Sequence, residues 1–150
     1  MRANLKRYED LRKQLEKDKA LRKRVAKMLK FWKSKNTLRD TVFRPSCSLD
    51  PKIYPEFDDT NVRDPGQLDI DWENAVTLSL YNCQIVDFDL IGAVLKKMPK
   101  LKALWINGNP CILDEQHSQL AEYYIVSNHP NIEIYNSKFT KNTREWGLKY

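Results

Sequence analysis

One pattern of eleven residues occurs three times in the second half of the chain. It reads AVTLSLYNCQI from Ala75, LKALWINGNPC from Leu101 and, less completely, HPNIEIYNSKF from His129. The starting positions of the copies are almost evenly spaced, and apolar residues alternate with other residues in the middle of each copy. Such alternation is typical of a strand with one buried face, so we expect three short strands that bury equivalent faces.

The segments that separate the copies have the composition of helices. Residues 89–97 and 115–127 contain no strand-like alternation, and each segment ends near a proline, Pro99 or Pro130. The pattern and its period resemble the template of leucine-rich repeats, in which parallel strands stack and each strand is followed by a returning segment. The resemblance implies an α/β fold, namely a short leucine-rich-repeat solenoid of two to three repeats preceded by a long basic N-terminal helix.

One position in the turn after each expected strand carries a small or polar side chain. The three residues are Cys83, Asn109 and Ser137, which we expect to stack in one column. A buried turn leaves backbone groups without partners, and a side chain at this position can bond to them. Asn109 suits this role best, because an amide both donates and accepts hydrogen bonds.

The charge of the chain is divided unevenly. The net charge is +6, but residues 1–39 carry 15 Lys/Arg against 4 Asp/Glu, whereas residues 40–150 carry 11 against 16. The N-terminal part has apolar residues at helical spacing and is either one helix or two helices with a break near Asp18–Lys19. We expect three parts, which are a basic amphipathic helix (1–35), an irregular acidic Pro-rich connection (36–71) and leucine-rich repeats with a C-terminal cap that includes Phe139 and Trp146 (72–150).

Repeat proteins of this kind usually bind partners through the outward-facing residues of their strands. The candidate partner-binding residues are Tyr81, Trp105, Asn107 and Tyr135. Trp and Tyr dominate the energetic centres of protein interfaces, so an exposed aromatic column of Tyr81, Trp105 and Tyr135 would be a binding site. The alternative is that the basic helix or residues 40–71 cover this face.

Two stretches of the last half resemble one family more narrowly. ALWINGNP at 103–110 and IEIYNSKFT at 132–140, followed by Glu145-Trp146, are similar to the repeat region of tubulin–tyrosine ligase-like proteins. The resemblance implies a cytoplasmic protein that acts at microtubules and whose ATP-grasp catalytic domain follows the repeats. None of that catalytic domain is present before Tyr150, so no catalytic residue is carried over.

The sequence contains no pattern typical of a catalytic, cofactor or metal site. Its 4 glycines are too scattered for a phosphate-binding loop, and its 2 histidines stand away from its 3 cysteines. We therefore expect no enzyme activity, no cofactor, no metal, and cysteines that are free and buried. No segment has the roughly 20 apolar residues of a membrane-spanning helix, and the first residues lack a signal-peptide pattern, so we expect a cytoplasmic protein without a membrane partner.

These observations favour a non-catalytic protein-protein interaction module, with tubulin or microtubules as the partner that the resemblance implies. The alternative is a basic nucleic-acid-associated adaptor, because the dense Lys/Arg run between Leu21 and Lys35 could neutralise phosphates. Two bland interpretations of the basic helix also stay open. It could cover the first strand, or the acidic stretch 50–71 could neutralise it.

Overall fold

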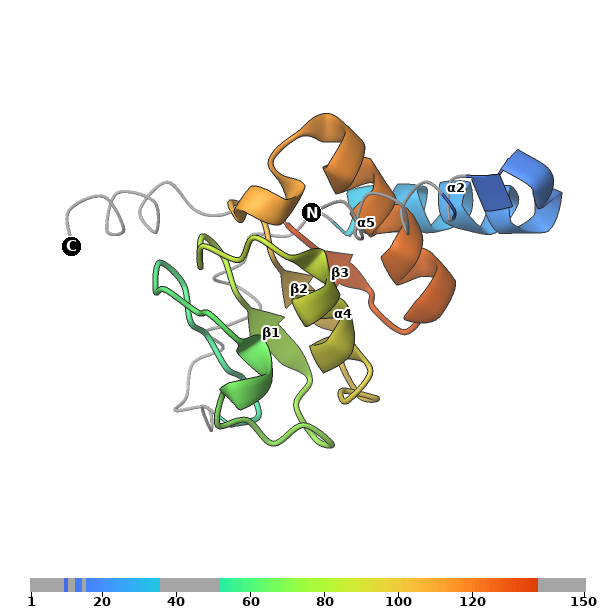
Figure 1. Cartoon of the computed structure of the whole chain (residues 1–150). Helices are drawn as coiled ribbons and strands as arrows, with labels where there is room; N and C mark the ends of the chain where they lie inside the picture. Colours follow the sequence, from blue (N-terminus) through green and yellow to red (C-terminus); the bar gives the residue numbers. More distant parts are fainter. Residues whose placement is uncertain (1–9, 11–12, 15, 36–51, 138–150) are drawn as a thin grey trace.

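In the computed structural model, which describes residues 10, 13–14, 16–35 and 52–137, three short strands form a parallel sheet in the order β1-β2-β3 (Figure 1). Helix α4 connects β1 to β2, and helix α5 connects β2 to β3. The elements are α2 (Lys19–Ser34), η1 (Pro65–Gln67), β1 (Thr77–Ser79), α4 (Phe88–Leu95), β2 (Ala103–Trp105), η2 (Pro110–Ile112), α5 (Glu115–Asn128) and β3 (Ile134–Tyr135).

Some expectations concern residues outside the described ones. These are the cap by Phe139 and Trp146, the burial of Cys47 and everything expected of residues 1–9, 11–12, 15, 36–51 and 138–150.

Both connecting helices begin at an aspartate that caps them. Asp87 accepts a hydrogen bond from the backbone N–H of Asp89 at 2.9 Å, and Asp114 accepts one from that of His117 at 3.1 Å. A carboxylate at this position satisfies an N–H group that has no partner within the helix. The bounds of the two helices lie close to those predicted from the sequence.

The core lies between the sheet and its two connecting helices. Leu78 and Leu104 project from neighbouring strands and, like Ile91 of α4, are almost completely buried. The side chain of Tyr124 in α5 reaches α4 at Gly92, where a Cβ would lie 3.0 Å from the tyrosine hydroxyl oxygen. Each fully buried aliphatic side chain of this layer contributes about 1.5–3 kcal/mol to stability.

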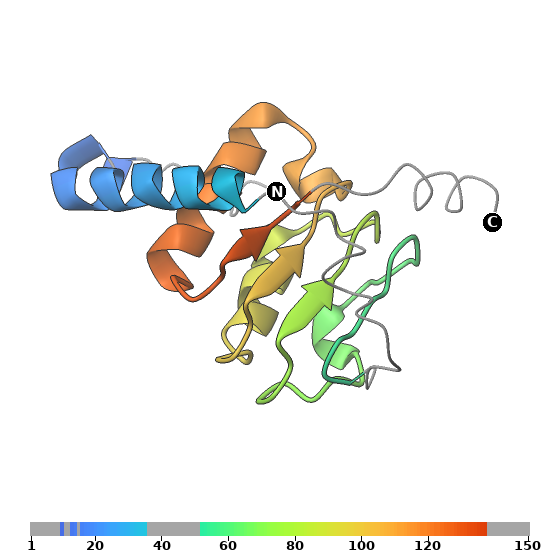
Figure 2. The same ribbon diagram turned by 180° about the vertical axis from the view of Figure 1, so that it is seen from behind.

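Helix α2 packs beside α5, near β3 (Figures 1 and 2). It begins after Asp18, which accepts a hydrogen bond from the backbone N–H of Leu21 at 3.1 Å. The boundary therefore falls at the possible break that the sequence indicated. Leu21, Val25 and Trp32 are the buried residues of α2. The interpretation that the basic helix covers the first strand is wrong, because α2 lies at the β3 side of the sheet.

An acidic segment runs along the opposite edge of the sheet, next to β1. The backbone N–H of Phe57 donates to the carbonyl oxygen of Ser79 at 2.9 Å, and that of Ser79 donates to Pro55 at 3.1 Å. Glu56 and Ser79 form a parallel bridge. The acidic stretch is therefore bound to β1, on the other side of the sheet from α2, and does not lie against the basic helix (Figure 2).

The expected leucine-rich-repeat solenoid is wrong. The described residues form three α-helices and a small open sheet of three parallel strands, and they show no solenoid. A solenoid requires each coil to repeat the one before it. Here the two connecting helices differ in length, since α4 has 8 residues and α5 has 14.

The strand register shows where the repetition fails. Thr77 is paired with Ala103, and these residues hold the same position in the first and second sequence copies. Ala103 is paired in turn with Ile134, whereas the third copy places Asn131 at this position. The third copy is therefore misaligned by three. Because side chains alternate along a strand, a shift by an odd number turns every side chain to the opposite face.

Candidate binding surface

The aromatic column predicted from the sequence is not an exposed surface. Trp105 is completely buried, and its indole Nε1–H donates to the hydroxyl of Ser137 at 3.0 Å. Tyr81 is partly buried and packs against the cluster formed by Ala103 and Trp105. Thr77 and Ser79 on the same face are also buried, so this face of the sheet is covered and offers a partner little area.

Tyr135 lies on the other face of the sheet, as the misalignment of the third copy requires. It is paired with Leu104, and its ring centroid lies 4.9 Å from that of Trp32 in α2. Its hydroxyl is buried without a hydrogen-bond partner among the described residues, and burial raises its pKa above the ordinary value. Tyr135 therefore helps to attach α2 and does not join Tyr81 and Trp105 in a common site.

Asn107 was the remaining candidate for partner binding. Its side chain is partly buried, and its amide oxygen is buried without a hydrogen-bond partner among the described residues. The backbone carbonyl of Asn107 accepts from the N–H of Asn82 at 3.0 Å, so the residue lies in the turn that follows β2. Nothing else in the described structure joins Asn107 to the other candidates.

Of the three turn residues that were predicted to stack, Cys83 and Asn109 are joined by a hydrogen bond, whereas Ser137 is bonded to a different residue. The amide oxygen of Asn109 accepts from the backbone N–H groups of Cys83 at 2.9 Å and Ile85 at 3.1 Å, and its amide nitrogen donates to the carbonyls of Leu80 and Ile106. Asn109 thus binds backbone of two successive turns. Ser137, in contrast, accepts from the Trp105 indole, so it does not occupy an equivalent rung.

The most strongly charged surface of the described structure is the outer face of α2. Residues 19–35 contain eight Lys/Arg side chains and no carboxylate, and all eight are exposed. Their charges stay in solvent because the buried positions of the helix are apolar, which is the ordinary pattern of an amphipathic helix. The basic residues are Lys19, Arg22, Lys23, Arg24, Lys27, Lys30, Lys33 and Lys35.

Helix α2 is held in place by polar as well as apolar contacts. The indole Nε1–H of Trp32 donates to the carbonyl oxygen of Ile132 at 2.9 Å, and this bond is buried. The buried side chains of Leu21 and Val25 anchor the preceding turns of the helix. The basic face is therefore presented by an attached element of the fold.

A shallow groove opens between α2 and the connection from α5 to β3. Its volume is about 290 Å³, and its lining is more apolar than polar. Cations and one carboxylate stand among the apolar residues. The lining residues are Arg24, Lys27, Met28, Phe31, Val126, Pro130 and Glu133. Sequence reasoning missed this groove. The helical spacing of its α2 residues was visible, but the residues on the facing segment were not.

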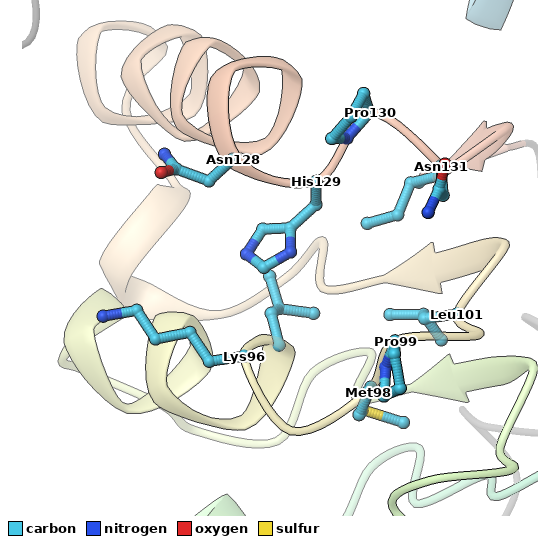
Figure 3. Close-up of a pocket in the computed structure, with 10 residues that line it drawn as sticks. Lys96, Met98, Pro99, Leu101, Asn128, His129, Pro130 and Asn131 are labelled. Atoms are coloured by element: carbon cyan, nitrogen blue, oxygen red, sulfur yellow. The ribbon is translucent and has the colours of Figure 1, made fainter.

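A second cavity, of about 360 Å³, lies between the ends of α4 and α5 (Figure 3). Figure 3 shows the ring of His129 pointing from the end of α5 into this cavity. The Nε2 atom of His129 is buried without a hydrogen-bond partner among the described residues. Burial and the nearby charge of Lys96 lower the pKa of His129 below its ordinary value, so the neutral ring is favoured.

The two described cysteines are poor nucleophiles, and the described residues form no cluster suited to a metal ion. Burial raises the pKa of Cys83 to about 11 and that of Cys111 to about 12, so both thiols stay protonated near neutral pH. Among the residues that the structure describes, no group of three or more His, Cys, Asp or Glu is placed to hold a metal ion. Within the same residues, no helix is both long enough and apolar enough to cross a membrane.

Comparisons of the chain with protein-family models, with curated proteins and with solved structures each gave no match.

Proposed function

We propose that this chain is a non-catalytic protein-protein interaction module that binds an acidic protein surface through the basic face of α2. The observation that carries the proposal is the set of eight exposed cations in residues 19–35, with no carboxylate among them, on a helix that is fastened to the sheet. A dense cluster of charges of one sign attracts a partner of the opposite charge and orients it as it approaches.

The charges of α2 are available to such a partner because the acidic part of the chain lies elsewhere. Residues 52–74 contain seven carboxylates and two cations, and their backbone is bonded to β1. The groove beside α2 contains a single carboxylate, that of Glu133. Most of the positive charge is therefore not neutralised by the described acidic segment.

Tubulin in microtubules is the partner to test first. The reason is the resemblance of residues 103–110 and 132–140 to tubulin–tyrosine ligase-like proteins. In this proposal the chain contributes binding and no ligase chemistry, and it works in the cytoplasm.

The second candidate is a nucleic-acid-associated adaptor that uses the same helix. The observation in its favour is again the exposed run of cations, because phosphate neutralisation depends mainly on the density of positive charge. It differs from the first candidate in the partner and not in the surface.

Cosedimentation with microtubules, run beside retention on double-stranded DNA at the same salt, tests the proposal. We expect the chain to sediment with microtubules, and the double variant Lys23→Glu/Lys30→Glu to bind at least about tenfold more weakly. The double variant Arg63→Glu/Lys96→Glu changes the net charge equally but lies away from α2, so it should bind nearly as the parent does. Equal losses in both variants, or retention on DNA alone, would overturn the proposal.

A further inference from the structure

We propose that the groove beside α2 binds an apolar side chain of the acidic partner, so that recognition depends on an anchor residue as well as on charge. This inference rests on the proposed function and specifies its partner as an acidic peptide segment with one large apolar residue. The groove is the one formed by α2 and the α5–β3 connection, with a volume of about 290 Å³.

The floor of the groove is suited to an apolar side chain. Met28 and Phe31 of α2 are partly exposed, and Val126 and Pro130 face them from α5 and the loop after it. The volume is near the lower end of the range for ligand pockets, which is enough for one large side chain and not for an extended ligand. An apolar side chain that moves from water onto this floor contributes the free energy of apolar burial to binding.

The rim of the groove selects the residues beside the anchor. Arg24 and Lys27 lie on the same face of α2 as Met28 and Phe31, because residues three or four apart share a helix face. Both cations are exposed and can pair with carboxylates on either side of the anchor. Charge complementarity thus favours an acidic peptide over a neutral or basic one.

One observation favours a peptide over a nucleic acid in this groove. The Nζ of Lys35 lies 5.7 Å from the ring centroid of Phe31, so one face of this ring already has a cation near it and is less available for base stacking. Glu133 also lines the groove, but its carboxylate repels phosphates and peptide carboxylates alike, so it does not distinguish the two.

The groove exists before a partner arrives. Its α2 wall is fastened by the Trp32–Ile132 hydrogen bond, and its other wall contains Val126, which is almost completely buried. A site that is already formed loses little entropy on binding, so an anchor contributes most of its burial energy to affinity.

The test uses two fluorescent peptides of alternating Glu and Asp, one with a central Phe and one with Ser in its place. Fluorescence anisotropy with the full chain should show that the Phe peptide binds at least about tenfold more tightly than the Ser peptide. Met28→Gln should remove most of this ratio, because the affinity for the Phe peptide should fall much further than that for the Ser peptide. Lys27→Ala should weaken the binding of both peptides more than the matched variant Lys30→Ala does, since Lys30 does not line the groove.

Circular dichroism and urea unfolding of Met28→Gln are the control that checks whether the variant is folded. Equal affinities for the two peptides, or an equal loss of both in Met28→Gln, would overturn the inference but leave the proposed function standing if microtubules still bind. Two other results would also overturn the inference. One is displacement of the Phe peptide by a single-stranded oligonucleotide whose binding depends equally on Met28. The other is competition between the Phe peptide and a second copy of the chain for the groove, measured by sedimentation velocity. Failure of both peptides and of microtubules to bind would overturn the inference and the proposed function together.

Discussion

The indole of Trp32 donates a hydrogen bond over 2.9 Å to the backbone carbonyl of Ile132, a residue near the other end of the described chain. Its ring also lies 4.9 Å from that of Tyr135. Ile132 lies in the last turn before β3 and Tyr135 lies in β3 itself, so Trp32 joins the N-terminal helix to the C-terminal strand.

Trp32→Phe should therefore lower the free energy of unfolding by about 2 kcal/mol, because a buried carbonyl loses its partner and the smaller ring leaves unfilled space. Urea unfolding followed by far-ultraviolet circular dichroism measures the change. Trp72→Phe is the matched control, since Trp72 is only partly buried. If both variants lose the same free energy, the Trp32 hydrogen bond is not what fastens α2.

Asn109→Ala should be the more damaging change. The substitution leaves two N–H groups and two carbonyls of the turns without the amide that now binds them, and Asn109 is completely buried. We expect a loss of about 3 kcal/mol or more in the free energy of unfolding. Asn74→Ala, at an exposed position, should cost well under half as much. Similar losses at the two positions would contradict the role assigned to Asn109.

Stability should fall as the solution becomes acidic, and His129 should account for part of the fall. Its pKa is lowered in the folded state by burial and by Lys96, so the unfolded chain takes up a proton more readily. The stabilisation is complete above the ordinary pKa of 6.5 and is lost as pH decreases through it towards the lower folded value.

The variant His129→Gln isolates this contribution. Urea unfolding at about pH 8 and about pH 5 should show a smaller difference in His129→Gln than in the parent chain. Burial raises the pKa of Glu122, which acts in the opposite direction near its own titration range, but both proteins contain Glu122. An unchanged pH dependence in the variant would show that His129 is not the group responsible.

Cys83 and Cys111 should resist alkylation in the folded protein. Both are buried, and burial raises the pKa of each thiol, to about 11 for Cys83 and about 12 for Cys111. In a Cys47→Ser background, iodoacetamide near neutral pH should modify these two residues only after urea is added, as mass spectrometry can show. Modification of either thiol at the rate of the unfolded chain would contradict the burial described above.

The sequence was sufficient for the local structure of the first two units. Aligning the first two copies places Thr77 opposite Ala103, which is the pairing found in the sheet. The helices expected at 89–97 and 115–127 are found at Phe88–Leu95 and Glu115–Asn128. These features depend on periodicity and helix termini, which are local properties of the chain.

The third strand was misaligned because its residues do not distinguish the two faces. Ile132, Ile134 and Tyr135 are all apolar or aromatic, so alternation permits either orientation. In the structure the Tyr135 ring packs against Trp32, a residue from the other end of the chain. A contact over such a separation leaves no trace in local periodicity.

The candidate site was missed for a related reason. Arg24, Lys27, Met28 and Phe31 share a helix face by their spacing, but the facing residues Val126 and Pro130 come from a distant segment. Conversely, Trp105 was chosen as exposed because it alternates with Leu104, whereas the structure buries it completely. Alternation shows which side chains share a face of the strand, but it does not show which of the two faces is exposed to solvent.

The acidic segment beside β1 and the basic helix beside β3 give the molecule an electric dipole across the width of its sheet. A negatively charged filament would turn the approaching molecule so that α2 leads and the β1 edge trails. The bound molecule would then show its carboxylates to the solvent, so neighbouring copies on the same filament would repel one another and space themselves apart at low ionic strength.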